Sequence, residues 1–250
     1  MNDITSKIEN DIQDRNSLAW HRLCEYVEKV AMEKLEEFSP YEALGLELFS
    51  QIHTLPETIS KLERVKKVWL YGSNLKRIPP EIGKMKSLKY FDPYTSYALH
   101  WFPYEITNCK KLIDSRVSTR VLYGNYKNRK KFPVLTHNPI RYIGQFVKCS
   151  ICDEEISYEK TNQFWISLAV GTDVLPLLVN VCSEDCKNKL PKPPPGYVPY
   201  PHKGGVDLRQ PSSKKWANAT MKKIPNEKME KSNENTNPKL IKIVKKIWEE

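Results

Sequence analysis

A repeated pattern between residues 55 and 112 constrains the fold of this chain more than any other feature of its sequence. In each copy an apolar residue precedes a proline, an isoleucine follows, and another apolar residue comes three positions after it. The copies start 23 and 24 residues apart. They read LPETISKLERV at 55–65, IPPEIGKMKSL at 78–88 and FPYEITNCKKL at 102–112. A unit this small cannot bury its apolar face alone, so the pattern predicts stacked copies that share one core.

The segment ahead of the middle copy has apolar side chains at strand spacing. It reads Val65-x-x-Val68-x-Leu70-x-x-Ser73-x-Leu75, which is similar to the strand signature of leucine-rich repeats, with Ser73 in place of the usual asparagine. We therefore predict an α/β fold that contains a short leucine-rich repeat solenoid. Each copy would contribute one short strand, and its proline-containing segment would return over the convex side.

The N-terminal residues 1–43 are expected to form a helical cap on this stack. Apolar side chains between Leu18 and Phe38 recur at helical spacing, and Pro40 closes the stretch. A repeat stack leaves an open apolar end, which an amphipathic helix can cover. The next segment, 41–54, is interpreted as a degenerate first strand with core positions at Leu46, Leu48 and Ile52.

The repeats are assigned to residues 44–140, and their pattern breaks at 91–106, which reads FDPYTSYALHWFPYEI. Pro93 occupies a strand core position in this segment. Because proline cannot donate to a sheet ladder, the strand there must be interrupted or lie at an edge. The aromatic side chains crowded into the segment have two interpretations, as filler of the core or as a binding platform, and the sequence leaves both open.

Four cysteines in two close pairs predict a metal site. Cys149-x-x-Cys152 and Cys182-x-x-x-Cys186 are separated by 29 residues. Two such pairs around a β-rich insert are typical of a tetrahedral structural zinc site. Ser183 can cap a helix that carries Cys186, and the arrangement resembles a treble-clef zinc finger.

We assign residues 141–208 to this small α+β zinc-binding module with a proline-rich extension. Because four cysteines fill the coordination shell, the zinc is expected to be structural rather than catalytic. His202 is an alternative ligand, although it follows Cys186 by 16 residues. Four free thiols or a disulfide are the alternatives to a metal.

The chain carries a net charge of +10, and much of it lies near the C-terminus. Residues 209–250 contain 11 Lys/Arg against 5 Asp/Glu and are predicted to be a basic disordered tail with a possible short helix at 240–250. The sequence has no apolar run long enough to span a bilayer and no signal-like N-terminus, and six cysteines are too few for a disulfide scaffold. We therefore expect a cytoplasmic protein.

Several segments resemble a group of bacterial leucine-rich repeat proteins of unassigned biochemical role. The resemblance covers about residues 45–208, and it implies that the zinc-binding module and the repeats belong to one unit. It implies no reaction, because the group has no catalytic motif to carry over. The segments are YGSNLKRIPPEIG, DPYTSYALHWFPYEIT, RVSTRVLYGN, TDVLPLLVNVCSEDC and GYVPYPHKGG.

The favoured function is binding of a protein or peptide partner through the exposed side of the repeat strands. A nucleic-acid-binding protein that uses the zinc module and the basic tail is the alternative. We expect no enzymatic activity, because the sequence has no glycine-rich phosphate loop, nucleophile elbow or spaced His/carboxylate set. In a repeat strand the side chains between core positions point outward, and the candidate contacts are Lys67, Trp69, Tyr71, Tyr90, Asp92 and Tyr94.

Overall fold

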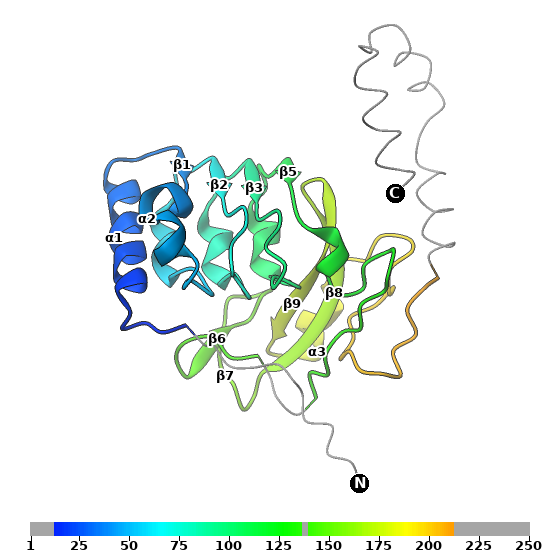
Figure 1. Cartoon of the computed structure of the whole chain (residues 1–250). Coiled ribbons are helices and arrows are strands. Elements are labelled where there is room, and N and C mark those ends of the chain that lie inside the picture. The colour runs from blue at the N-terminus through cyan, green and yellow to red at the C-terminus, as the bar shows by residue number, and fades with distance from the viewer. Residues whose placement is uncertain (1–12, 137–139, 213–250) are drawn as a thin grey trace, which may run out of the picture.

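The computed structural model describes residues 13–136 and 140–212 (Figure 1). The N-terminal half holds helices α1 and α2 and a set of very short strands, and the C-terminal half is mainly β-structure. The elements outside the 3-10 helices are α1 (Leu18–Met32), β1 (Glu37–Phe38), α2 (Pro40–Phe49), β2 (Lys67–Trp69), β3 (Tyr90–Asp92), β4 (Phe102–Pro103), β5 (Asp114–Ser115), β6 (Phe146–Lys148), β7 (Glu155–Ser157), β8 (Asn162–Val170), β9 (Asp173–Val181) and α3 (Glu184–Asn188).

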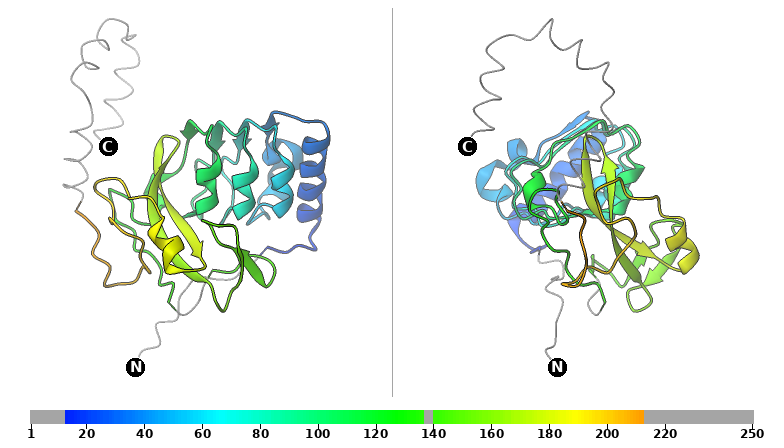
Figure 2. Two further views of the ribbon diagram at one scale, coloured as in Figure 1. Left: turned by 180° about the vertical axis from the view of Figure 1, so that it is seen from behind. Right: turned by 90° about the vertical axis from the view of Figure 1, so that its right-hand side faces the viewer.

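The first sheet is parallel and has the strand order β1-β2-β3-β5. Its neighbouring strands pair Phe38 with Val68 and Val68 with Phe91. These three side chains are buried, so β1, β2 and β3 each deliver one apolar residue to a common core. Helices α1 and α2 lie at one end of this sheet (Figures 1 and 2).

The three sequence copies form three 3-10 helices, η1 (Glu57–Lys61), η2 (Pro80–Lys84) and η3 (Tyr104–Asn108). Each begins after a proline in extended conformation and contains one of the repeated isoleucines, whose side chains are buried. The helices stack closely: a Cβ atom added to Gly83 of η2 would lie 2.6 Å from the Glu105 carbonyl oxygen of η3. Glycine is required there because the next helix occupies the space of a side chain.

The second sheet has the order β4-β9-β8 and is built around a long hairpin. Strands β8 and β9 have nine residues each and pair antiparallel along their whole length. The two-residue strand β4 joins them by parallel pairing, with Phe102 opposite Leu177. A third, two-stranded sheet consists of β6 and β7.

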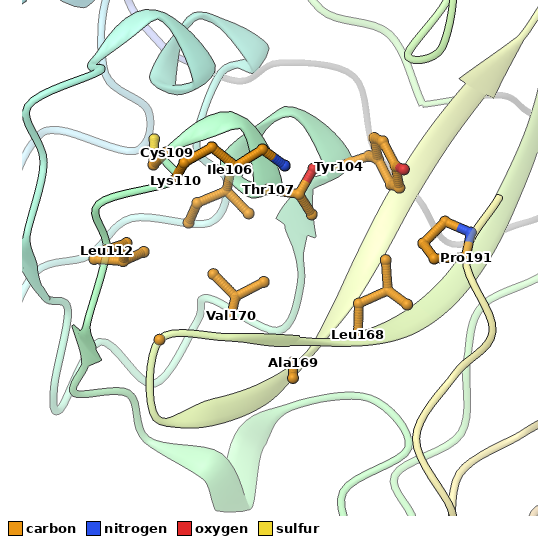
Figure 3. Close-up of a pocket in the computed structure, with 11 residues that line it drawn as sticks. Tyr104, Ile106, Thr107, Cys109, Lys110, Leu112, Leu168, Ala169, Val170 and Pro191 are labelled. Atoms are coloured by element: carbon orange, nitrogen blue, oxygen red, sulfur yellow. The ribbon is translucent and has the colours of Figure 1, made fainter.

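The β8–β9 hairpin closes the end of the first sheet that is remote from α1 (Figures 1 and 2). Figure 3 shows Leu168 and Val170 of β8 pointing toward the side of η3 that carries Ile106, while Ala169 points away. The Ser115 hydroxyl of β5 donates to the Val170 carbonyl oxygen at 2.6 Å. A hollow of about 380 Å³ remains between η3 and β8.

The prediction of a leucine-rich repeat solenoid is wrong. The structure is a mixed α/β arrangement with small sheets and few helices in the described part of the chain, not a clear solenoid. Strands of two or three residues form the repeated part, and the residues that begin the third copy, Phe102–Pro103, differ from those of the other copies by pairing with β9 of the second sheet. Stacking stops because the long hairpin, rather than another copy, covers the open end of the core.

Helix α1 lies within the segment expected to form a helical cap, whose residues 1–12 are outside the described part of the chain, and the prediction for the following segment is wrong. Residues 41–54 contain the helix α2 instead of a degenerate strand, and Leu46 is 68% exposed rather than in the core. Pro40 at the first helical position fixes a helix-compatible φ and starts this helix. The strand that pairs with β2 is β1, which falls inside the segment assigned to the helical cap.

Buried residues from α1 to α3 form one continuous hydrophobic cluster, which includes Leu23, Phe91, Ile166 and Cys186. The boundaries proposed at residues 43/44, 140/141 and 208/209 stay predictions. The predicted disordered tail lies outside the described residues from 213 onward, and so does its possible helix at 240–250. A search of the described helices finds none with the length and apolar character needed to cross a membrane.

Candidate metal centre

The four paired cysteines meet at one point. The sulfur atoms of Cys149, Cys152, Cys182 and Cys186 all lie within 4.8 Å of one another. The Cys152–Cys182 and Cys182–Cys186 sulfur distances are 3.5 and 3.6 Å. A tetrahedral metal with metal–sulfur bonds of about 2.3 Å has sulfur–sulfur edges of about 3.8 Å, so the cluster has the dimensions of a four-thiolate metal site.

The first pair lies in the turn between β6 and β7. The backbone N–H of Cys149 donates to the Glu154 carbonyl oxygen at 2.7 Å, and the Asp153 N–H donates to the Cys149 carbonyl oxygen at 3.0 Å. Asp153 has a φ of 62°, a left-handed conformation that aspartate tolerates better than most residues. This tight turn brings Cys152 back beside Cys149.

The second pair lies where β9 ends and α3 begins. Cys182 follows the last residue of β9, and Ser183 caps the helix by accepting a hydrogen bond from the Cys186 N–H at 3.2 Å. Glu184 and Asp185 occupy the first turn, where acidic side chains are favourable. The predicted helix start is therefore confirmed, and it turns Cys186 toward Cys182.

Hydrogen bonds distribute charge unevenly among the thiols. Burial raises the pKa of Cys149, but backbone N–H groups of Cys152, Ile151 and Cys182 donate to its sulfur and together bring the pKa down to about 7. The pKa of Cys182 is raised to about 12, because its hydrogen bonds with the sulfur atoms of Cys152 and Cys186 favour the protonated thiol. Without a metal ion, the hydrogen bonds thus favour ionisation of Cys149 over that of Cys182. A divalent cation would stabilise all four groups as thiolates.

Ser150 ties this centre to the rest of the molecule. Its N–H donates to the Asn180 carbonyl oxygen of β9 at 2.7 Å, and its hydroxyl donates to Glu105 of η3 at 2.6 Å. The Asn180 N–H donates back to the Ser150 hydroxyl at 3.1 Å. The position of the first cysteine pair is therefore fixed against both the long hairpin and the stacked 3-10 helices.

The alternatives to a metal site differ in their fit to this geometry. All six cysteines lie within the described residues and are free, and the sulfur distances of 3.5 and 3.6 Å exceed a disulfide bond of about 2.05 Å. His202 is outside the cluster: its ring packs edge-on against Phe132 at 4.6 Å, and its Nδ1 accepts from the Gly204 N–H. The structure thus assembles a site that can hold a metal ion.

The predicted partner contacts on β2 lie on the outer side of the first sheet. Tyr71 is 56% exposed, whereas Lys67 and Trp69 are partly buried. Both of these side chains bind Glu37 of β1, the Lys67 ammonium at 2.8 Å and the Trp69 indole N–H at 2.9 Å. These contacts lower the pKa of the Glu37 carboxyl.

On β3 and the residues after it, the predicted contacts divide into two kinds. Tyr90 and Tyr94 are 37% and 39% exposed. Asp92 is 5% exposed; its carboxylate accepts from the Tyr94 N–H at 3.0 Å and pairs with Arg116 at 3.2 Å. The Arg116 guanidinium also lies over the Tyr94 ring, 4.8 Å from its centroid.

The aromatic segment 91–106 contains both buried and exposed rings, so only some of its rings fill the core. Phe91, Trp101 and Phe102 are buried in the core, whereas Tyr94 and Tyr97 are exposed, with Tyr97 at 65%. Strand β3 ends at Asp92, so the interruption predicted from Pro93 is confirmed. Sequence reasoning did not select Tyr97 or Arg116 for this surface; the only available indication for Tyr97 was its place in the broken repeat.

Comparison with models of protein families gives no match for the chain, and comparison with curated proteins gives none either.

Proposed function

We propose that this protein binds a protein or peptide partner through the outer side of its first sheet and that its four cysteines hold a structural zinc ion. The observation that carries the proposal of partner binding is a group of neighbouring exposed tyrosines, called the tyrosine face: Tyr71, Tyr90, Tyr94 and Tyr97.

The tyrosine face has the chemistry of an interaction surface. The rings of Tyr71 and Tyr94 lie 6.1 Å apart, because the Gly72 N–H binds the Tyr94 carbonyl oxygen and aligns the two segments. Tyrosine supplies a large contact area at a low cost in side-chain entropy, and it is enriched among the residues that dominate binding energy. Exposed rings that lie together just after the ends of adjacent strands, as Tyr71 and Tyr94 do, are more informative than scattered ones.

Intramolecular contacts hold part of this surface in place before any partner arrives. Arg116 covers one side of Tyr94, and Asp92 fixes the Tyr94 backbone. Trp69 is held by Glu37 at the neighbouring position of the sheet. Side chains that are ordered in the free protein lose less entropy on binding, which supports a face preorganised for recognition.

Zinc is the metal whose chemistry suits the cysteine cluster best. Zinc is bound by thiolates in tetrahedral four-ligand sites, and two Cys pairs on a tight turn and a helix start supply such a set. Four protein ligands leave no open position for a substrate, which supports a structural role. The ion would join the β6–β7 hairpin to α3 by direct bonds.

Partner capture with matched variants tests the tyrosine face. The full chain would be immobilised, captured proteins identified by mass spectrometry, and the affinity of the identified partner measured by calorimetry. The double change Tyr71→Ala and Tyr94→Ala should weaken binding by about 2 kcal/mol or more, with the melting temperature kept. Tyr41→Ala is the control, because Tyr41 is 49% exposed on α2, away from the face.

The same experiment separates protein binding from nucleic-acid binding. Capture that survives nuclease treatment and moderate salt supports the proposal. Capture that disappears with nuclease, or that depends equally on the control tyrosine, contradicts it. Salt-sensitive binding that is insensitive to both tyrosine changes would instead assign function to the positive charge of the chain.

A further inference from the structure

A polar pocket lies between the stacked 3-10 helices and the β6–β7 hairpin. Its volume is about 480 Å³. Residues of η2 and η3 form one wall and residues around β6 and β7 form the other. Its lining includes Glu81, Glu105, Tyr142, Phe146, Val147 and Tyr158.

Three buried oxygen atoms in this lining have no hydrogen-bond partner. They are the Glu81 Oε2, the Glu105 Oε2 and the Tyr142 hydroxyl. Among the described residues six buried side-chain nitrogen or oxygen atoms lack a partner, and half of them therefore meet at this one pocket. Buried polar groups are nearly always satisfied in proteins, so a concentration of exceptions at one cavity points to a ligand.

The sequence repeat supplies the two carboxylates. Glu81 and Glu105 each directly precede the repeated isoleucine of their copy, Ile82 and Ile106, and so they occupy equivalent positions in η2 and η3. Stacking of the two helices through Gly83 places the positions side by side. The pocket is thus a product of the repeat and of the hairpin that covers it.

The two walls are held firmly. The Glu105 Oε1 accepts from the Ser150 hydroxyl at 2.6 Å, which leaves the Oε2 as the free acceptor. The Tyr142 N–H donates to the Tyr158 hydroxyl at 2.7 Å. Burial raises the pKa of Glu105 to about 7 and also raises the pKa of Glu81, as expected for carboxyl groups removed from water.

The other charged side chains of the lining are either exposed to solvent or already paired. The side chains of Lys84, Lys86 and Lys148 are exposed, and the Lys86 ammonium is bound to the Gly83 carbonyl oxygen at 2.7 Å. Glu57 is paired with Arg15 at 2.9 Å. Lys84 and Lys148 lie near enough to oppose the rise in the pKa of Glu81, but neither forms an ion pair with the buried oxygens.

From these contacts we infer that the pocket binds a primary alkylammonium group. An ammonium has three N–H donors and no acceptor, which matches three oxygens that lack donors. The volume exceeds what an ammonium alone requires, and Phe146 and Val147 give an alkyl stem an apolar wall. The group can belong to a lysine side chain of a peptide or to a free small amine, and these sources share the same recognition chemistry.

Titration of the full, metal-loaded chain with small probes tests the inference. The probes are lysine capped at both ends, norleucine capped in the same way, and 1,5-diaminopentane, and binding is followed by NMR shifts of the Tyr142 and Tyr158 rings. Capped lysine should give saturable shifts, and capped norleucine should give none. Stronger binding of capped lysine identifies a peptide source, and stronger binding of the diamine identifies a free amine.

Variants assign the binding to the three oxygens. The double change Glu81→Gln and Glu105→Gln should weaken binding of the better probe by about tenfold or more, because hydrogen bonds to charged groups are lost. Glu63→Gln is the matched control, since Glu63 is exposed outside the pocket. If the double variant does not fold, Tyr142→Phe removes a single hydroxyl and should still lower the affinity.

Three results would overturn the inference. The first is the lack of any saturable shift with either amine at tens of millimolar, which would mean that the pocket holds only water. The second is equal binding of capped lysine and capped norleucine, and the third is an equal loss of affinity in the Glu63→Gln control. Either of these would mean that the three oxygens do not recognise the ligand.

Discussion

The first sheet differs from the cysteine-bearing hairpins, β6–β7 with Cys149 and Cys152 and β8–β9 followed by Cys182, in how the strands are stabilised. Strands β1, β2, β3 and β5 have only two or three residues, yet β1, β2 and β3 each deliver an apolar side chain to a core shared with the stacked 3-10 helices, and β5 delivers the buried Ser115. The β6–β7 hairpin also has three-residue strands, but its outward residues are exposed and it buries little beyond Val147 and Ile156. Its position depends on the cysteine cluster and on Ser150.

This contrast explains where each kind of site lies. A face held by many small apolar contacts can leave its outer side chains free, and the tyrosine face occupies such a surface. A hairpin with few apolar contacts needs a specific link, which a metal can supply in place of a core. The pocket lined by Glu81 and Glu105 takes one wall from the stacked 3-10 helices and the other from the β6–β7 hairpin.

Loss of the metal should produce the largest effect on stability, and it should affect the cysteine-bearing hairpins more than the first sheet. Cys186→Ser should abolish the binding of about one zinc per chain and unfold the cysteine-bearing hairpins, because metal-binding free energy on the order of 10 kcal/mol contributes to folding. Metal analysis of the purified protein and hydrogen exchange of residues 146–188 measure this. The first sheet should retain more of its protection.

Cys109→Ser is the control for this change. Cys109 is buried between η3 and its neighbours, and its thiol donates to the Ile82 carbonyl oxygen at 3.2 Å. A serine can keep that hydrogen bond, so we expect a loss of about 1–3 kcal/mol and full metal content. Metal-free protein that melts at the same temperature as the metal-loaded form would contradict a structural ion.

The stacked region should be most sensitive where two helices touch. Gly83→Ala places a methyl group 2.6 Å from the Glu105 carbonyl oxygen, which belongs to rigid backbone. We expect a loss of about 1–3 kcal/mol in the free energy of unfolding, measured by urea denaturation, with zinc content unchanged. Lys84→Ala, at the exposed next position, should change stability by less than about 0.5 kcal/mol. Equal effects of the two changes would show that η2 and η3 are not in close contact.

The sequence predicted the local elements better than the fold. The copies at 55–65, 78–88 and 102–112 predicted equivalent units, and they form equivalent 3-10 helices because each has the same proline and isoleucine spacing. The pattern did not show that Phe102–Pro103 pairs with β9, since that contact joins residues about 75 positions apart. The solenoid prediction was wrong for this reason.

The candidate metal site was more predictable than the pocket beside it. Each cysteine pair is local in sequence, and the Ser183 cap is visible three residues before Cys186. Glu81 and Glu105, in contrast, look like ordinary surface residues of 3-10 helices in the sequence. Only the β6–β7 hairpin, which is distant in the chain, buries them.

The turn of the long hairpin should give a smaller, pH-dependent effect. The pKa of Asp173 is raised from 3.8 to about 6, mainly by burial; a hydrogen bond with Thr172 opposes the rise and nearby Asp114 adds to it. A carboxyl whose pKa is raised by folding stabilises the native state below its unfolded pKa, and this contribution is lost as the pH rises through about 6.

Asp173→Asn should therefore be more stable than the native chain at pH 7 by about 1 kcal/mol, a value reduced for partial solvent exposure. The difference should vanish near pH 4. Thermal melts at several pH values measure it, and Asp207→Asn, a change at an exposed carboxylate, is the control. A variant that follows the native pH profile would show that Asp173 is fully solvated.

The smallest effect on stability is expected at the tyrosine face itself, and it sharpens the comparison of the two sides of one strand. Tyr97→Ala and Tyr90→Ala should each change the free energy of unfolding by about 0.5 kcal/mol or less, because their rings face solvent. Phe91→Ala, in the same strand as Tyr90, should cost about 3–5 kcal/mol, since its ring is 1% exposed. Chemical denaturation of the three variants measures the free energy of unfolding for both the exposed and the buried positions. A large loss at Tyr97 or Tyr90 would mean that these rings support the fold, and a partner would then have to be sought on another surface.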